Sequence, residues 1–402
     1  MTQTTRATAM RSRTMQGRQM RAAGFGSRQQ RRRMFNADAV GGLDWMLIGA
    51  VIGIALLGMV MIYSTTRNLI DDDPLYFVKR QSVALVVAAG LVFAIMKIDY
   101  RKFRDYSMLA YVITVVLLFF VLTPIGAEAK GAQAWYQLPF NFQLQPSEIA
   151  KFGIIVALAG YVNEHRGDID AWRLTVIIGL ALVPIGLVQL QPDLGTNMVL
   201  ICVVLALLAV AGVRGRYLLV LGLLGITLVY AVISVGVLKQ YQLDRLTVPY
   251  EGATGERLQG AAYNQNQSVK TIASGGVLGQ GITEGKQTEL GFVPEQQTDF
   301  IFTAVGEELG FVGAVLLMSL FGIVLWRTWR TAQLARDYYG TLVCAGVLGM
   351  FTFMIFENIG MTLGIMPVTG IPLPFMSYGG SSLLASAACI ALVLNVHANR
   401  FN

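Results

Sequence analysis

The feature that most constrains this chain is a series of ten apolar stretches, each close to the length that a helix needs to cross a membrane. About 20 mostly apolar residues are required to span the roughly 30 Å hydrocarbon core of a bilayer. The composition agrees, because 54% of the residues are hydrophobic and 14% are charged, whereas soluble domains carry about 25% charged residues. We therefore predict an all-α, polytopic integral membrane protein with about ten transmembrane helices. They are expected at residues 44–65, 76–96, 106–123, 147–163, 174–190, 195–212, 217–236, 299–325, 338–362 and 379–397.

The basic residues between these stretches indicate the orientation of the bundle. Lysine and arginine concentrate in cytoplasmic connections, and an even number of helices leaves both termini on one side. One set of connections holds 21 of the 31 basic residues: the N-terminal tail, 97–104, 163–173, 213–216, 326–336 and Arg400. We predict that both termini are cytoplasmic. The large loop of residues 237–298, between the seventh and eighth helices, is then extracytoplasmic.

The N-terminal tail differs from the rest of the chain. Its first 37 residues hold nine arginines and no acidic residue, and it has few large apolar residues with which to form a core. We predict that residues 1–40 are a disordered, Arg-rich cytoplasmic tail, and that residues 41–402 form the transmembrane domain. A topology signal is the favoured interpretation of the tail, and binding of anionic lipid or of nucleic acid is the alternative. Membrane lipids are expected partners and nucleic acid is not.

Three of the predicted outer connections are rich in glycine, proline and polar residues: 124–147, 237–298 and 363–378. The second contains the glycine-rich run Ala273–Gly281. Irregular backbone near a membrane has to be buried in protein or to line a wet cavity. We therefore expect a site at the outer surface. The three cysteines lie in separate apolar stretches without metal-ligand spacing, so neither a disulfide nor a zinc site is expected.

Asp299 stands where the polar loop 237–298 enters an apolar helix. We expect it in the first helical turn, with Thr298 or Gln297 as the N-cap. The partial positive charge of a helix N-terminus favours an anion there, so the carboxylate could serve only as a cap. An ionisable residue at the mouth of a membrane helix is, however, a candidate for function. Both interpretations stay open at this point.

Gln145–Lys151 opens the fourth predicted helix, and Pro146 fits its first turn. Glu148 and Lys151 are three residues apart and share a helix face. They could neutralise each other, which makes burial tolerable. Alternatively, Lys151 binds an anionic head group and Glu148 orients the lysine. A lysine at this depth opposes the orientation of the other basic residues, so we favour the second interpretation.

The remaining polar residues of the helices have simpler interpretations. Asp193, in the run Gln191–Thr196, is expected to cap the sixth helix. Acids buried in a bundle usually pair or form hydrogen bonds inside it. We therefore expect structural roles for Glu307 and Glu308 in the eighth helix, and for Glu357 with Asn358 in the ninth.

Two further segments offer contacts for a ligand. Met376–Ser382 contains two glycines and three serines before the last helix, so hydroxyl and N–H groups of residues such as Ser377 and Tyr378 could hold an anion. The alternative is a tight turn with small-residue packing. Trp135 in the first outer loop could stack on a sugar, although an interfacial position is the simpler interpretation.

Taken together, these motifs resemble the SEDS family of bacterial cell-wall polymerases, which includes RodA, FtsW and SpoVE. The resemblance covers residues 43–397. Its motifs are Gln-Pro-Ser-Glu-Ile-Ala-Lys (145–151), Gln-Pro-Asp-Leu-Gly-Thr (191–196), Pro-Glu-Gln-Gln-Thr-Asp-Phe-Ile-Phe (294–302), Gly-Glu-Glu-Leu-Gly (306–310) and Pro-Phe-Met-Ser-Tyr-Gly-Gly-Ser-Ser (374–382). Residues 367–374 look most like RodA, since division members typically carry a lysine in place of Thr369. The family often has arginine where this chain has Ala134.

The resemblance implies a peptidoglycan glycosyltransferase of the bacterial cytoplasmic membrane. Such an enzyme joins lipid II units at the outer face and releases undecaprenyl diphosphate. The family's essential acid matches Asp299, which would act as the general base. The leaving diphosphate needs a cation, for which Lys151, Arg245 and a divalent metal ion, Mg²⁺ or Mn²⁺ near Asp299, are candidates. The implied partners are a class B penicillin-binding transpeptidase and the elongation cytoskeletal complex, with a role in cell shape.

Other functions fit parts of this pattern. Ten helices with buried acids also suit a transporter or lipid II flippase, but such proteins typically contain repeats with matched broken helices near the midplane, and no such repeat is visible here. A non-catalytic scaffold for a transpeptidase leaves the position of Asp299 unexplained. A division or sporulation homologue would run the same chemistry at another place in the cell.

Overall fold

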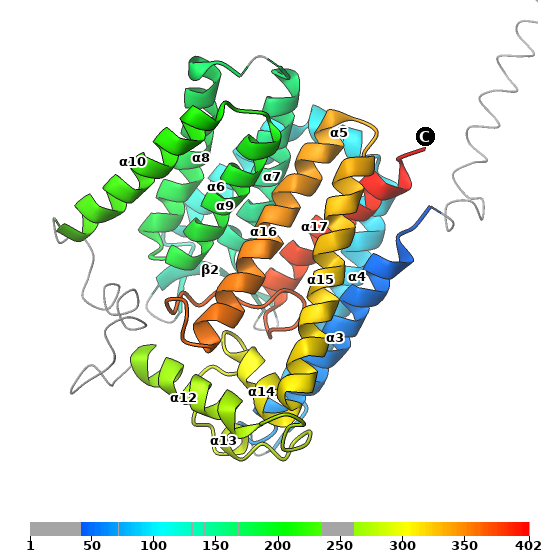
Figure 1. Ribbon diagram of the computed structural model, residues 1–402, viewed down its shortest axis with the longest axis vertical. Coiled ribbons are helices and arrows are strands. Elements are labelled where there is room, and N and C mark those ends of the chain that lie inside the picture. The colour runs from blue at the N-terminus through cyan, green and yellow to red at the C-terminus, as the bar shows by residue number, and fades with distance from the viewer. Residues whose placement is uncertain are drawn as a thin grey trace, which may run out of the picture. The chain divides into compact units, whose positions relative to one another are not determined.

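The computed structural model describes residues 42–70, 72–129, 132–139, 142–167, 169–234 and 261–401. The Arg-rich tail 1–40 and Arg245 therefore lie outside the described residues. From Trp45 onward the chain forms one compact unit, and everything below concerns that unit. It is built almost entirely from helices, which are packed along one another (Figure 1).

Helices occur at every one of the ten predicted apolar stretches. They are α3 (Trp45–Thr66), α4 (Tyr76–Lys97), α6 (Ser107–Val121), α7 (Pro146–Glu164), α8 (Ala171–Leu190), α9 (Leu194–Val210), α10 (Gly215–Ser234), α14 (Ile301–Glu308) followed by α15 (Gly310–Leu334), α16 (Tyr338–Thr362) and α17 (Gly380–Ala398). Among the described residues, six helices are long and apolar enough to cross a membrane: α3, α4, α8, α15, α16 and α17. The total number of membrane crossings and the side on which the termini lie stay predictions.

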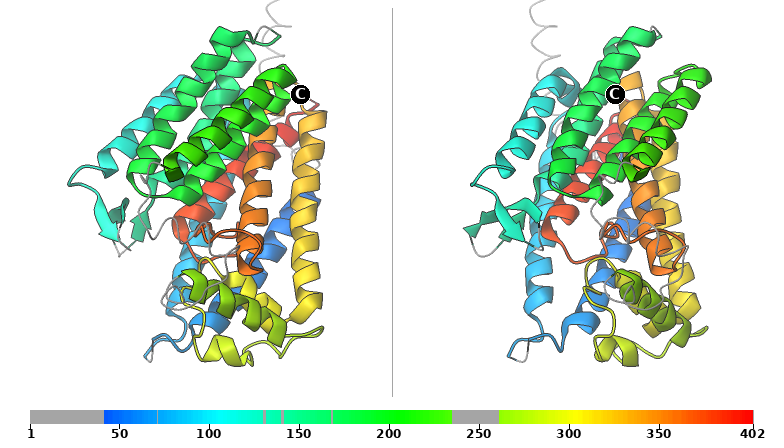
Figure 2. Two further views of the ribbon diagram at one scale, coloured as in Figure 1. Left: turned by 60° about the vertical axis from the view of Figure 1, so that its left-hand side comes forward. Right: turned by 90° about the vertical axis from the view of Figure 1, so that its left-hand side faces the viewer.

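Two helices form the centre of the bundle. α17 packs against α4, α7 and α16, and α16 also packs against α9 and α15. In both views of Figure 2, α17, in red, lies among the neighbouring helices. Small residues line much of α17, among them Ala385, Ser386 and Ala388, and small side chains let membrane helices approach closely. The outer helices α3, α4 and α8 instead expose large apolar side chains, as expected of surfaces that face lipid.

The structure departs from the predicted pattern in three places. The predicted helix 299–325 is broken between α14 and α15, because Gly310 adopts a left-handed conformation with φ of +65°. Part of the loop 237–298 is helical, as α12 (Ala261–Ser274) and α13 (Lys286–Glu289). The first outer connection forms an antiparallel three-stranded sheet from β1 (Ala127–Ala129), β2 (Ala132–Leu138) and β3 (Phe142–Leu144). The chain is therefore mostly helical and not all-α.

A short helix, α5 (Tyr100–Asp105), lies at the opposite end of the bundle from α12, α13 and α14 (Figure 1). There Tyr100 donates a hydrogen bond to Asp337 at 2.7 Å, and Arg101 lies 3.5 Å from the same carboxylate. Burial and the bond to Asp337 raise the pKa of Tyr100 to about 12. This network fastens α5 to the start of α16.

Candidate functional site

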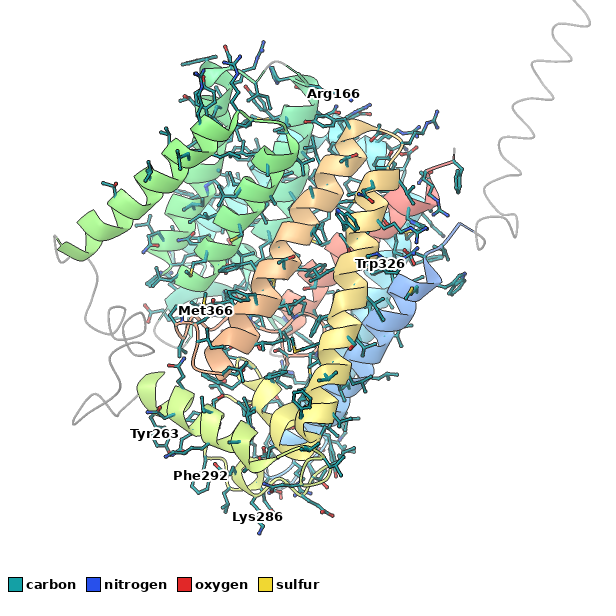
Figure 3. All side chains as sticks on the ribbon, viewed as in Figure 1. Arg166, Tyr263, Lys286, Phe292, Trp326 and Met366 are labelled. Atoms are coloured by element: carbon teal, nitrogen blue, oxygen red, sulfur yellow. The ribbon has the colours of Figure 1, made fainter. Side chains whose placement is uncertain are left out.

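The irregular segment 363–379 organises one end of the bundle. Pro367, Pro372 and Pro374 prevent it from continuing α16 as a helix, because proline lacks a backbone N–H and clashes with the preceding turn. The segment connects the end of α16 to the start of α17, and Met366 marks its position in Figure 3. It meets the loop before α14 and the start of α9, and three of the predicted site residues lie on it or against it.

Asp299 lies in the turn before α14 and is half-buried. The helix begins at Ile301, and its N-cap residue is Phe300, whose side chain makes no capping hydrogen bond. The prediction that Asp299 sits in the first helical turn, capped by Thr298 or Gln297, was therefore wrong. Thr298 instead donates to the carbonyl oxygen of Glu295 at 3.0 Å, which closes the turn on itself. Asp299 therefore lies two residues before the first residue of α14.

Asn358 connects this loop to the segment 363–379. Its side-chain amide donates to the carbonyl oxygens of Asp299 and Ile371, each at 2.8 Å. The residue is fully buried in α16. A buried amide that bridges the two loops helps to fix their spacing, because losing either bond would leave a buried carbonyl without a partner. Sequence reasoning gave Asn358 only a structural role and did not connect it to Asp299.

The carboxylate of Asp299 faces Gly370. Gly370 has φ of +74°, and a Cβ placed there would lie 3.3 Å from the Asp299 Oδ2 atom. The preceding residue, Thr369, donates its hydroxyl to Glu357 at 2.9 Å. The end of α16 thus fixes both neighbours of the Gly370 peptide, through Glu357 on one side and Asn358 on the other. The expected internal hydrogen bonding of Glu357 and Asn358 is confirmed.

Ser377 and Tyr378 lie close to the Asp299 loop. The Tyr378 N–H donates to the carbonyl oxygen of Gln297 at 2.9 Å. The Ser377 hydroxyl is buried and accepts from the Leu373 N–H at 2.8 Å, so it closes a turn within its own segment. Burial raises the pKa of Tyr378, and the positive charge of Arg80 opposes part of that rise. Of these two residues, Tyr378 is the one with side-chain surface left for a ligand.

The starts of α7, α9 and α17 are held together beside this segment. Asp193 caps α9 by accepting from the Thr196 N–H at 2.9 Å, as predicted. Its second oxygen accepts from Gln145 and Ser147, each at 3.2 Å. The Ser381 hydroxyl accepts from the Gln145 N–H at 3.0 Å. Three helix N-termini therefore converge, and each contributes partial positive charge to this end of the bundle.

Glu148 and Lys151 form an ion pair inside the bundle. The Lys151 Nζ atom lies 2.7 Å from the Glu148 Oε1 atom, and the two side chains are only 2% and 5% exposed. The other carboxylate oxygen of Glu148 is buried with no hydrogen-bond partner. The shared helix face was predicted correctly. The geometry is that of the self-neutralising pair, so contact between Lys151 and a ligand stays a prediction that requires the lysine to become accessible.

Trp135 lies in β2 and is half-buried, opposite Ala127 in the sheet. The sheet is fastened to α6 by its neighbour Tyr136, whose hydroxyl donates to the Leu117 carbonyl oxygen at 2.9 Å. The sheet reaches the start of α17, because the Gln143 carbonyl oxygen accepts from the Ser381 hydroxyl at 2.9 Å.

Arg80 is a cation that sequence reasoning missed. It lies in the first turns of α4, donates to the Tyr76 hydroxyl at 2.7 Å, and stacks 5.1 Å from the centre of the Phe142 ring. Next to it, Phe77 packs edge-on against Tyr378 at 5.2 Å. One signal in the sequence could have found it, since an arginine at the start of an apolar helix opposes the predicted orientation as Lys151 does.

Glu307 and Glu308 hold the loop around α13. Glu307 is fully buried and accepts from the backbone N–H groups of Gln287 and Thr288 at 2.7 and 3.0 Å, and from the Thr288 hydroxyl at 2.6 Å. Glu308 accepts from the Ser64 hydroxyl and the Thr283 N–H. Both acids therefore have the structural contacts that the sequence led us to expect.

Among the described residues, Asp299 offers its carboxylate to a divalent ion at this site. Within the described residues, no group of three His, Cys, Asp or Glu side chains is arranged to hold a metal. Mg²⁺ commonly binds through one or two carboxylates together with substrate phosphates and water. The single carboxylate of Asp299 would therefore suit a metal ion that takes most of its ligands from a bound phosphate group and water.

Comparison with known proteins identifies the relatives of this chain. Residues 44–402 match the family model described as cell cycle protein, FtsW/RodA/SpoVE. The stage V sporulation protein E of Bacillus subtilis is 34% identical over 88% of this chain and 96% of its own length. The probable peptidoglycan glycosyltransferase FtsW of Geobacter sulfurreducens is 31% identical over 90% of this chain and 96% of its own length.

Solved structures agree with this assignment. A chain from a peptidoglycan synthase complex that coordinates polymerization and crosslinking matches with a TM-score of 0.76 and 34% identity, covering 90% of this chain and 99% of that chain. The rod shape determining protein RodA of Thermus thermophilus matches with a TM-score of 0.67 and 33% identity, covering 90% and 98%. The chain is a multi-pass integral protein of the bacterial cytoplasmic membrane, and it belongs to the SEDS family of RodA, FtsW and SpoVE proteins.

Proposed function

We propose that this chain is a peptidoglycan glycosyltransferase that polymerises lipid II at the outer face of the cytoplasmic membrane. The observation that carries the proposal is the placement of Asp299. Its backbone is fixed by Asn358, and its carboxylate faces Gly370 in the segment 363–379, which also contacts the start of α9. Two relatives are named as a probable peptidoglycan glycosyltransferase and a peptidoglycan glycosyltransferase, and the match covers 96% and 84% of their lengths.

In the proposed reaction, a sugar hydroxyl of one substrate attacks the anomeric carbon of the other. A glycosidic C–O bond forms, the bond from that carbon to the diphosphate oxygen breaks, and the hydroxyl proton passes to the Asp299 carboxylate. Undecaprenyl diphosphate leaves with the bonding electron pair. The charge that develops on the diphosphate has to be stabilised. We propose Arg80, which lies near Tyr378, and the helix N-termini for this role, and Arg245 and Lys151 are the further candidates from the sequence.

A divalent metal ion would supply additional positive charge beside the diphosphate. Asp299 is the described residue that would hold it, and Mg²⁺ and Mn²⁺ both accept carboxylate and phosphate oxygens. The chain itself positions Asp299 beside the segment 363–379, through the hydrogen bond from Asn358 to the Asp299 backbone. Lys151 contributes to binding only if its pair with Glu148 opens, since its side chain is 2% exposed.

We further propose a role in cell elongation, with a class B penicillin-binding transpeptidase as partner and the elongation cytoskeletal complex around both. Thr369 and the surrounding residues 367–374 resemble RodA, and one of the matching structures comes from a peptidoglycan synthase complex. The sporulation and division relatives are equally similar in sequence, so a division or sporulation role with the same chemistry is the alternative.

The test is polymerisation of purified lipid II by the chain in proteoliposomes, with and without the transpeptidase and with Mg²⁺ or Mn²⁺ varied. Asp299→Asn should remove glycan synthesis while the protein stays folded. The matched control is Glu295→Gln, an exposed acid four residues earlier in the same loop, which should keep activity. Glycan chains from the Asp299→Asn protein would contradict the proposal. Lipid II translocation without polymer from the native chain would favour a flippase.

A further inference from the structure

The glycine-rich run Ala273–Gly281 has a defined place in the structure, at the break between α14 and α15. A helix break inside a membrane protein leaves backbone N–H and C=O groups without helical partners. Here the run supplies those partners. The Gln280 and Gly281 N–H groups donate to the carbonyl oxygens of Glu307 and Glu308, at 2.9 and 3.0 Å.

The same run also satisfies the first turn of α15. The Phe311 and Val312 N–H groups donate to the carbonyl oxygens of Gly276 and Val277, at 3.0 and 3.1 Å. Glycine is required for this approach, because a Cβ on Gly279 would overlap the Glu308 carbonyl. Irregular backbone is tolerated at membrane depth when its polar groups are satisfied within the protein, and this segment meets that condition.

The length of α15 indicates the depth of the break. At its far end, Trp326 is flanked by the guanidinium groups of Arg327 and Arg330, at 5.5 and 5.7 Å from its ring, an arrangement typical of a membrane–water interface. Figure 3 shows Trp326 on α15, well away from the end of the bundle at which Lys286 and Phe292 lie. From Phe311 to Leu325 the helix has about fifteen apolar or neutral residues and rises about 22 Å. This apolar part is shorter than the roughly 30 Å hydrocarbon core, whereas the whole of α15 is long enough to cross it, so the break lies close to the edge of the core.

The contacts of α3 give the same depth independently. α3 has 22 residues and is among the six helices able to cross a membrane. Ser64, in its last turn, donates to Glu308, the residue that ends α14. Arg67, just beyond α3, donates to the Thr283 carbonyl oxygen at 2.7 Å and lies 3.6 Å from Glu289. The break is therefore level with the last turn of α3, which contains Ser64, and residues 283–289 are level with Arg67, the first charged residue after the helix.

The side chains of the run continue the lipid-facing surface of α15. Val277 and Leu278 are 66% and 80% exposed, and Phe311 and Val312, which are hydrogen-bonded to the same run, are 65% and 53% exposed. Large apolar side chains this exposed at the end of a membrane helix require an apolar environment. The exposed surface is continuous with that of Val315 and Leu316 on the candidate membrane span.

We propose that residues 275–281 form a re-entrant element whose Val277 and Leu278 side chains are inserted among lipid acyl chains. Part of the sequence between α10 and α14 is then embedded in the membrane and not in the aqueous loop to which it was assigned. The occupant of this surface is the bilayer itself. The proposal rests on the position of α15 in the membrane and not on the glycosyltransferase activity, so either can fail without the other.

The test measures the depth of spin labels on the full chain in liposomes. Cys344 and Cys389 are buried and Cys202 is partly exposed, so labels are attached to Leu278→Cys in a Cys202→Ser background. Val315→Cys, on the outer surface of α15, is the control for lipid, and Lys286→Cys, exposed on α13, is the control for water. The relative relaxation by dissolved oxygen and by a water-soluble nickel chelate reports depth.

The Leu278 label should resemble the Val315 label, with strong relaxation by oxygen and weak relaxation by nickel. A Leu278 label as accessible to nickel as the Lys286 label would overturn the proposal. If it became shielded from nickel only after a second protein was added, the surface would be a protein-docking site and the membrane assignment would be wrong. Should Leu278→Cys fail to fold, Val277→Cys gives the same readout one residue away.

Discussion

The side-chain amide of Asn358 donates a hydrogen bond of 2.8 Å to the carbonyl oxygen of Asp299, fifty-nine positions earlier in the chain. Its second N–H reaches Ile371 at the same distance. One buried amide in α16 thus fixes the position of the candidate general base relative to the segment 363–379. The site consequently depends on a residue that contacts neither the reacting sugar nor the diphosphate in the proposed mechanism.

Replacing Asn358 with aspartate should reduce polymerisation at least about tenfold. A carboxylate cannot donate to both carbonyl oxygens, each buried group left unpaired costs about 1–3 kcal/mol, and small displacements of a reacting group slow catalysis strongly. The matched control is Asn395→Asp, because Asn395 likewise donates to two carbonyl oxygens, those of Ile95 and Ile98, but near the opposite end of the bundle. Both variants should lose thermal stability, and only Asn358→Asp should lose turnover per folded molecule. Equal turnover in the two would show that Asn358 has no positioning role.

Gly370→Ala should impair activity more than Gly364→Ala does. Both glycines have a left-handed backbone, with φ of +74° and +77°, and in both a Cβ would meet a neighbour at 3.3 Å. The strain of placing alanine there is therefore similar. The neighbour differs, since Gly370 faces the Asp299 carboxylate and Gly364 faces Val269. Steady-state kinetics on lipid II should show a lower kcat for Gly370→Ala at equal expression. Indistinguishable kcat values would mean that the Asp299 carboxylate tolerates displacement.

A double substitution can separate the structural role of the Glu148–Lys151 pair from a role of Lys151 in substrate binding. Lys151→Met alone leaves a buried carboxylate without its partner, which is expected to destabilise the fold by about 3–5 kcal/mol. Adding Glu148→Gln removes that charge and should restore most of the thermal stability. If Lys151 also contacts the diphosphate, the stable double variant should still bind lipid II more weakly than the native chain. Native affinity in the double variant would reduce the lysine to a structural role.

The positions of the helices could be predicted from the sequence, because membrane-spanning helices are set mainly by long apolar stretches. The break at Gly310 could not, since the residues on both sides of it are apolar and one glycine inside such a stretch is usually tolerated. The small sheet of residues 127–144 was also missed. Its strands are three to seven residues long, too short for an alternating pattern to stand out.

The candidate site could be predicted only in part, because a sequence indicates contacts within one helix better than contacts between distant segments. Local relations were correct, such as the Asp193 cap and the helix face shared by Glu148 and Lys151, because they depend on spacing along one helix. Relations between distant segments were not, since nothing along the chain indicates that Asn358 reaches back to Asp299. The accessibility of Lys151 was likewise open, because the sequence gives the depth of a residue along a helix and not what packs over it.

Glu307 should stabilise the loop before Asp299 through a chain of polar contacts. It accepts three hydrogen bonds from Gln287 and Thr288, and the Thr288 hydroxyl in turn accepts from Gln296 at 2.9 Å. The same Gln296 amide donates at 2.8 Å to Thr303, at the start of α14.

Glu307→Gln weakens these charge-assisted bonds by roughly 2 kcal/mol, so the amide protons of Gln287 and Thr288 should exchange about 30-fold faster if exchange follows local opening. Hydrogen exchange measured by mass spectrometry on the full chain in detergent checks this. Glu284→Gln, an exposed acid in the same loop, should leave the rate unchanged. Equal protection in the native chain and in Glu307→Gln would mean that packing against α14, and not the carboxylate, holds this loop in place.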